Sequence, residues 1–146
     1  MPPLQLPPTA SNTDAMTDLQ SLTADLLRFR DERDWKQFHT LKDLIISLNL
    51  EAGELLELTQ WKPEDQLQAL KADAGFMEAL GDECADVLLY LLLVANEAGI
   101  DLAEAARRKI GKNALKYPVA QARGSARKYN APGDAGRSGA DEGIGS

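Results

Sequence analysis

Two pairs of carboxylates, each spaced three residues apart, are the side chains in this sequence whose type and spacing best fit chemistry. Glu51 and Glu54 lie in the segment LEAGELLE, and Glu83 and Asp86 lie in DECADVLLY. Both segments carry a helical apolar pattern. At about 100° per residue, Glu51 and Glu83 fall on the apolar faces, while Glu54 and Asp86 fall at their edges. The sequence therefore predicts two helices that direct four carboxylates toward one place.

Carboxylates gathered in this way need a positive partner. They repel one another and lose hydration on burial, so an uncompensated cluster would cost several kcal/mol or force protonation. Mg²⁺ prefers oxygen ligands and commonly keeps waters or substrate phosphates in its shell. The four acids are therefore predicted to hold Mg²⁺ at a site suited to a polyphosphate. The alternative is that they are ordinary solvated acids. Glu57, further round the helix, is predicted to face solvent or to lie next to the metal ligands without binding the metal itself.

Composition narrows the class of protein. The 146 residues, 44% of them hydrophobic, suffice for one domain with a helical core. A net charge of −7, from 16 basic and 23 acidic residues, argues against a partner that is a nucleic-acid polymer. The single cysteine, Cys84, favours a reducing, cytoplasmic setting, and the N-terminus does not resemble a signal peptide. The apolar run 87–95 is too short to span a membrane.

The pattern along the chain predicts an all-α fold. Residues 1–16 are interpreted as a disordered leader, 17–130 as one domain and 131–146 as a disordered tail. Thr17 and Gln20 are predicted to form a capping box that opens the first helix. Helices are predicted over 18–33, 40–60, 64–72, 77–98 and 101–116, with a break at 73–75 and ends near Gly99 and before Pro118.

The helix predicted over 77–98 is hydrophobic on every side. A bundle this small would not cover it alone, which predicts a homo-oligomer whose interface takes in part of Leu88, Leu89, Leu92 and Leu93. A monomer with a well-covered central helix is the alternative. The fold predicted is thus a four-helix-bundle type with an oligomeric helical core.

The spacing of the four acids, Glu-x-x-Glu and then Glu-x-x-Asp after 28 intervening residues, resembles the motif of the MazG-like all-α nucleoside triphosphate pyrophosphohydrolases. The flanking segments are similar to the dCTP pyrophosphatase branch of that family. They are RDWKQFH at 33–39, QWK at 60–62, DVLLY at 86–90, KYP at 116–118 and RGSARKY at 123–129. The resemblance covers about residues 17–130 and leaves the connection at 62–78 unmatched.

The resemblance implies Mg²⁺-dependent hydrolysis of a nucleoside triphosphate between the α and β phosphates, with Glu51, Glu54, Glu83 and Asp86 as metal ligands and catalytic groups. It also implies that Trp35, His39 and Trp61 help to form the base pocket, although each could instead be a structural residue. Tyr90 is then expected under the sugar, and Lys109 and Asn113 on the phosphates. Arg127 and Lys128 could close over the site or form a solvated basic patch. A homotetramer is expected, with a dimer as the next choice.

Two other functions stay open at this point. The same chemistry could act on another pyrimidine or on a modified nucleotide, because a base pocket is not readable in atomic detail from sequence. Alternatively, the chain could be a non-catalytic helical scaffold that keeps the carboxylates only as a structural metal site.

Overall fold

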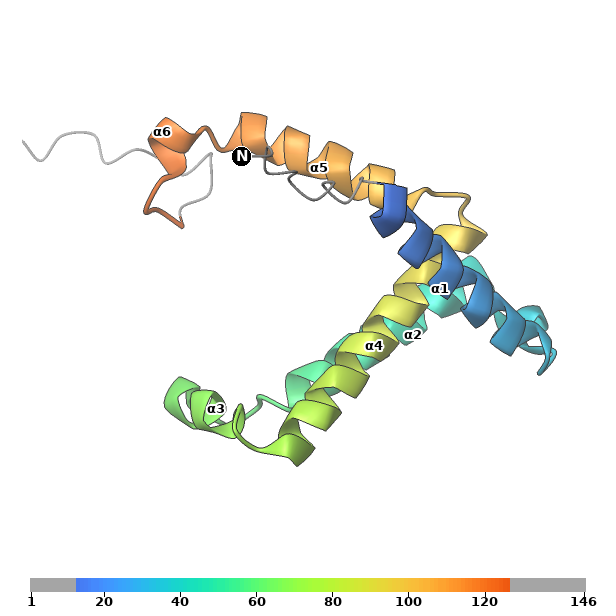
Figure 1. The fold of residues 1–146 in the computed structure, drawn as a ribbon. Coiled ribbons are helices and arrows are strands. Elements are labelled where there is room, and N and C mark those ends of the chain that lie inside the picture. Colours follow the sequence, from blue (N-terminus) through green and yellow to red (C-terminus); the bar gives the residue numbers. More distant parts are fainter. Residues whose placement is uncertain (1–12, 127–146) are drawn as a thin grey trace, which may run out of the picture. The chain divides into compact units, whose positions relative to one another are not determined.

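All regular elements in the part of the chain that the structure describes are helices (Figure 1). The structure is a computed structural model that describes the backbone of residues 13–126 and the side chains of residues 18–126. Its elements are α1 (Thr13–Asp31), η1 (Trp35–Phe38), α2 (Leu41–Glu57), α3 (Glu64–Leu70), α4 (Ala74–Glu97), α5 (Leu102–Lys116) and α6 (Val119–Ala122). The predicted all-α class is confirmed. The predicted tail, most of the leader, Arg127 and Lys128 lie outside the described residues.

The chain divides into two compact units, residues 1–105 and residues 106–146. In the first unit, α2 and α4 lie side by side (Figure 1), and α1 contacts α4 and η1. The second unit contains most of α5 together with α6. The carboxylate-bearing helices therefore belong to one unit.

The helices α2 and α4 run in opposite directions. At one end of the pair, the charge of Glu97 near the end of α4 acts on His39, which precedes α2. Further along, Glu51 of α2 lies beside Glu83 and Asp86 of α4. Residue numbers thus rise along α2 as they fall along α4, and this register brings the middle of α4 to the second half of α2.

Side-chain caps fix where these two helices begin. The Thr40 hydroxyl accepts a hydrogen bond from the Asp43 backbone N–H at 3.2 Å and donates one to the Asp43 carboxylate at 2.7 Å. At the start of α4, the Asp73 carboxylate accepts from the Phe76 N–H at 2.7 Å. The far end of α4 stops at Gly99, whose φ of 66° suits glycine, as the sequence predicts.

Several predicted boundaries are wrong. Thr17 lies inside α1 and cannot be its N-cap, because the helix already begins at Thr13 and TDAM contains no breaker. The break predicted at 73–75 is confined to Asp73, which is the N-cap of α4. Because the Asp73 side chain accepts a hydrogen bond from a backbone N–H of the first turn, α4 begins at Ala74 and includes Gly75. The predicted helix over 40–60 ends at Glu57. The short helices η1 and α6 were not predicted.

The core is small, and its buried apolar side chains come from α2 and α4. Leu44, Leu92, Leu93 and Ala95 are buried. Leu92 and Leu93 are therefore covered within the chain and add little to the predicted interface, whereas Leu88 stays 37% exposed. Many other large apolar side chains are exposed, among them Ile45, Ile46, Leu50 and Leu56 of α2. An oligomer that covers such residues remains a prediction. No described helix combines the length and apolarity needed to cross a membrane.

Candidate metal centre

The depth of the four acids follows the apolar pattern of their helices. Glu51 shares its face of α2 with buried Leu44 and is half-buried, whereas Glu54 at the edge is exposed. On α4, Glu83 is half-buried and Asp86 is exposed. Each helix therefore holds one carboxylate against the core and one at the solvent edge, as the sequence predicts.

Three of these carboxylates converge. Glu51, Glu83 and Asp86 can each offer an oxygen such that all three oxygens lie within 4.8 Å of one another. Oxygens that share one Mg²⁺ lie at most about 4.2 Å apart, because each sits about 2.1 Å from the ion. Small rotations of the side chains would close that difference. Glu54 does not join this group of oxygens, but its charge acts on both Glu51 and Glu83.

The electrostatics of the cluster favour a cation. Burial raises the pKa of Glu51, and the charges of Glu54, Asp86 and Glu83 raise it further. Burial also raises the pKa of Glu83, with added contributions from four neighbouring acids. The charged groups that shift these two pKa values are all acids, so no described cation compensates them. In addition, Glu83 Oε2 is buried without a hydrogen-bond partner among the described residues. The donor set therefore fits a hard divalent cation.

Two further acids contribute to the negative potential at Glu83. The sequence analysis did not predict the first and gave two possible places for the second. Asp82 raises the pKa of Glu83 and was not singled out, although it directly precedes Glu83 in the sequence. Glu57 is exposed, which agrees with one of its two predicted places, and its charge also acts on Glu83. Both acids strengthen the negative potential around the three converging carboxylates.

The structure separates the residues expected to contact a base. Trp35 and His39 precede α2, and Trp61 follows it. A helix of 17 residues is about 25 Å long. One chain therefore places Trp61 near the carboxylate end of α2 and the other two residues beyond its opposite end. A single pyrimidine cannot touch all three within one chain.

His39, just before the start of α2, lies near both a positive and a negative side chain. Its Nδ1 atom is buried without a hydrogen-bond partner among the described residues. Burial lowers the pKa of His39, the charge of Arg30 lowers it further, and the charge of Glu97 opposes both. The imidazole is accordingly neutral at pH 7.

The remaining expected contacts divide between the two units. Tyr90 is half-buried one turn after Asp86 on α4. Lys109 and Asn113 are exposed on the part of α5 that belongs to the second unit. Their roles on the sugar and the phosphates remain predictions.

Comparison with known proteins gives a consistent result. A family model described as the MazG-like family matches residues 46–131, which include all four acids. dCTP pyrophosphatase 1 of Bos taurus is 39% identical over 119 residues, which cover 82% of this chain and 69% of the relative. The Homo sapiens protein of that name is 39% identical over 114 residues, covering 78% and 65%. The chain thus spans about two thirds of the length of these curated relatives.

A solved structure agrees with this match. The crystal structure of a pyrophosphatase from Archaeoglobus fulgidus aligns with a TM-score of 0.58 and 34% sequence identity, covering 78% of this chain and 99% of that one. Fold, acid motif and sequence similarity thus lead to one conclusion: the chain belongs to the MazG-like family.

Proposed function

We propose that this protein is a Mg²⁺-dependent nucleoside triphosphate pyrophosphohydrolase that prefers dCTP and helps to keep the nucleotide pool clean. The observation that carries the proposal is the convergence of Glu51, Glu83 and Asp86 on one point. The names of the relatives support both the reaction and the substrate. In this reaction, water oxygen bonds to the α-phosphorus and the bond between that phosphorus and the bridging oxygen breaks. The products are a nucleoside monophosphate and pyrophosphate.

The four acids would hold Mg²⁺ through the three converging carboxylates, with Glu54 close by. When bound, Mg²⁺ would neutralise triphosphate charge and lower the pKa of the attacking water. Glu54 is the best candidate for the base that accepts the proton of that water, because it is exposed at the edge of the cluster. Glu51 and Glu83, which are half-buried, would hold the ion in place.

The base pocket would be built from two copies of the chain. Trp61 follows the end of α2 that carries Glu51 and Glu54, whereas Trp35 and His39 precede its other end. If all three contact one pyrimidine, a second copy must bring Trp35 and His39 to the carboxylates of the first. The exposed apolar side chains of α2 give such a pairing a surface to bury. A homotetramer, with a dimer as the next choice, meets this requirement.

The other proposed substrate contacts are those that the family resemblance implies. Tyr90, one turn after Asp86, would pack against a deoxyribose next to the α-phosphate. Lys109 and Asn113 would bind the phosphates: the lysine would supply positive charge and the asparagine amide a hydrogen bond. Each of these roles is testable by substitution and a comparison of KM with kcat.

The sharpest test of the proposed reaction is hydrolysis of dCTP in ¹⁸O-labelled water with Mg²⁺. Attack at the α-phosphorus should place the label in dCMP and leave pyrophosphate unlabelled. Label in pyrophosphate would indicate attack at the β-phosphorus, and orthophosphate as the first product would indicate another phosphohydrolase. If none of the four deoxynucleotides or dUTP is hydrolysed while Mg²⁺ still binds, the carboxylates form a structural metal site.

A further inference from the structure

Three side chains at the junction of α1 and η1 form a cluster of two aromatic rings, which meet edge to face, and a guanidinium. The Arg33 guanidinium carbon lies 3.6 Å from the centre of the Phe29 ring and 6.0 Å from the centre of the Trp35 ring. The two ring centres are 5.8 Å apart, and the ring planes make an angle of 78°. Trp35 therefore has an aromatic and a cationic neighbour, both anchored at the end of α1.

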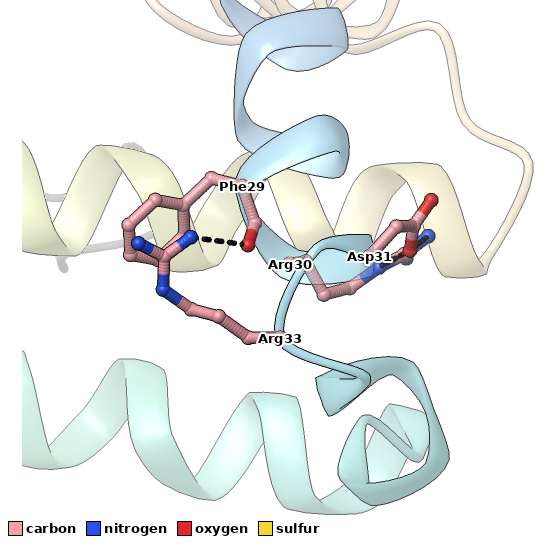
Figure 2. Close-up of polar contacts among 4 residues, drawn as sticks. All are labelled: Phe29, Arg30, Asp31 and Arg33. Atoms are coloured by element: carbon pink, nitrogen blue, oxygen red, sulfur yellow. Dashed lines mark hydrogen bonds and ion pairs between the residues drawn. The ribbon is translucent and has the colours of Figure 1, made fainter.

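The Arg33 side chain is itself held in place. Its Nη1 donates a 2.9 Å hydrogen bond to the Phe29 backbone carbonyl, which Figure 2 shows as a dashed line beside the ring. That carbonyl lies in the last turn of α1, where carbonyls lack partners within the helix and a cation is favourable. The guanidinium thus serves two purposes, because it satisfies the helix end and covers the face of Phe29.

The backbone that carries Trp35 is fixed from the other side. Asp34 adopts a left-handed conformation with φ of 53°, which non-glycine residues rarely adopt. Gln37 Nε2 donates to the Asp34 carbonyl at 3.0 Å and to the Asp34 carboxylate at 2.8 Å. These bonds close the turn around Trp35, so both its backbone and one side of its ring are restrained.

The restraint matters because the Trp35 side chain is otherwise open to solvent. The residue is 44% exposed, and Phe29 is 46% exposed. A half-exposed indole without neighbours would exchange between rotamers, and that freedom would be lost on binding a base. A ring that is already oriented loses less on binding.

We infer that Phe29 and Arg33 are positioning residues that hold the Trp35 indole in the orientation in which it contacts the base of the substrate. The inference rests on the proposed role of Trp35 in base recognition. It requires arginine at position 33, because only a planar guanidinium can donate to the carbonyl and lie flat on the ring at once.

The first test is spectroscopic and needs no substrate. The chain has two tryptophans, so full-length Trp61→Phe protein reports Trp35 alone. In that background, Arg33→Gln should weaken the near-ultraviolet circular dichroism of the indole, and Arg33→Lys should recover little of it. The matched control is Arg28→Gln, which removes an exposed arginine of the last turn of α1 that pairs with Asp25. This control should leave the signal unchanged.

The second test uses dCTP kinetics with Trp61 intact. Arg33→Gln and Phe29→Leu should each raise KM about 3- to 10-fold while kcat stays within about 2-fold of native. Phe29→Leu keeps Arg33 and gives an independent result if loss of the arginine impairs folding. Equal spectra or equal KM values for Arg33→Gln and Arg28→Gln would overturn the inference.

A third variant separates this inference from the proposed function. If Trp35→Leu raises KM but Arg33→Gln does not, the base contact stands and the positioning role is overturned. If Trp35→Leu leaves KM unchanged while dCTP is hydrolysed, Trp35 does not contact the base, and the positioning role is overturned with it. If both variants raise KM and Arg28→Gln does not, the inference is supported.

Discussion

Glu51 of α2 and Glu83 of α4 bring carboxylate oxygens within 4.8 Å of each other although 31 residues separate them in the chain. Both pKa values are raised, first by burial and then by neighbouring acids. Without a cation, this pair opposes the packing of α2 on α4. With a cation, the same pair joins the two helices. Stability and catalysis should therefore respond in opposite directions to neutralisation of either residue.

The first prediction concerns Glu51→Gln and Glu83→Gln. Each substitution removes one repelling charge and keeps the shape of the side chain, so the metal-free protein should be as stable as native or more stable. Each also removes a ligand charge, so metal affinity and turnover should fall roughly 100-fold or more. Thermal unfolding with and without Mg²⁺, together with pyrophosphate release, measures both effects.

The matched control for these variants is Glu78→Gln. Glu78 is an exposed acid on the same helix as Glu83 and does not contribute to the shifted pKa values of the cluster. It should retain native activity and a native response to Mg²⁺. If Glu51→Gln and Glu83→Gln behaved like this control, the proposed metal centre would be wrong.

The second prediction concerns pH. A folded-state pKa raised above the ordinary glutamate value of 4.5 means that the folded chain binds protons more readily than the unfolded chain. The contribution of Glu51 and Glu83 to metal-free stability should therefore decrease as pH rises from about 4.5 through the raised pKa values, and stay low above them.

Mg²⁺ acts against this trend because it binds deprotonated carboxylates. At a concentration about 100 times its Kd, it should add about 2.7 kcal/mol at a pH where the acids are ionised. That gain would raise Tm by on the order of 10 °C. The increase measured at about pH 5 should be clearly smaller than at about pH 8. An equal increase at both values would argue against binding at these acids.

The third prediction uses the fact that His39 is the only histidine of the chain. Its imidazole should give a single NMR titration, with a pKa below 6.5 because of burial and the charge of Arg30. Arg30→Met should raise the pKa toward 6.5, and Glu97→Gln should lower it further. The neutral imidazole contributes stability that is present above about pH 6.5 and is lost as pH falls through the lowered pKa. A native titration at or above 6.5 would contradict the environment described.

The fourth prediction tests whether two chains complete one site. Glu83→Gln removes a proposed metal ligand, whereas Trp35→Ala removes a proposed base contact from the opposite end of α2. If each site combines the carboxylates of one copy with Trp35 of another, subunits mixed in equal amounts and reassembled should form some intact sites. For exchange within dimers, about one quarter of all sites would be intact, which kcat/KM for dCTP would report. No recovery after verified subunit exchange would place the whole site within one chain.

Much of the carboxylate cluster could be predicted from sequence because it depends on helical periodicity. The 3.6-residue repeat places Glu51 beside Leu44 and Glu83 beside Val87, and these acids are half-buried in the structure. The distance between Trp35 and Trp61 was also accessible, since a helix predicted over 40–60 already separates them. A pocket that holds both side chains therefore needs two copies of the chain.

Other features depend on geometry that periodicity does not contain. The stack of Arg33 on Phe29 depends on a hydrogen bond to a helix-end carbonyl and on a left-handed Asp34. The capping role assigned to Thr17 was wrong because local motifs do not show how far a helix extends beyond them. The burial of Leu92 and Leu93 depends on α1 and α2 packing on α4, which is a tertiary property.

The last prediction concerns Trp61, which combines a φ of 64° with 91% exposure. A bulky side chain in the left-handed region is strained by about 1–2 kcal/mol, and glycine is not. Trp61→Gly should therefore be more stable to urea than Trp61→Ala by about 1 kcal/mol, because alanine keeps the strain. Both variants should lose stacking on the base and raise KM for dCTP roughly 10-fold. Equal stabilities would show that the backbone there is unstrained. An unchanged KM in both variants would show that Trp61 does not touch the base. A more stable glycine variant together with a raised KM in both would show that the strained backbone at Trp61 positions the indole for substrate binding.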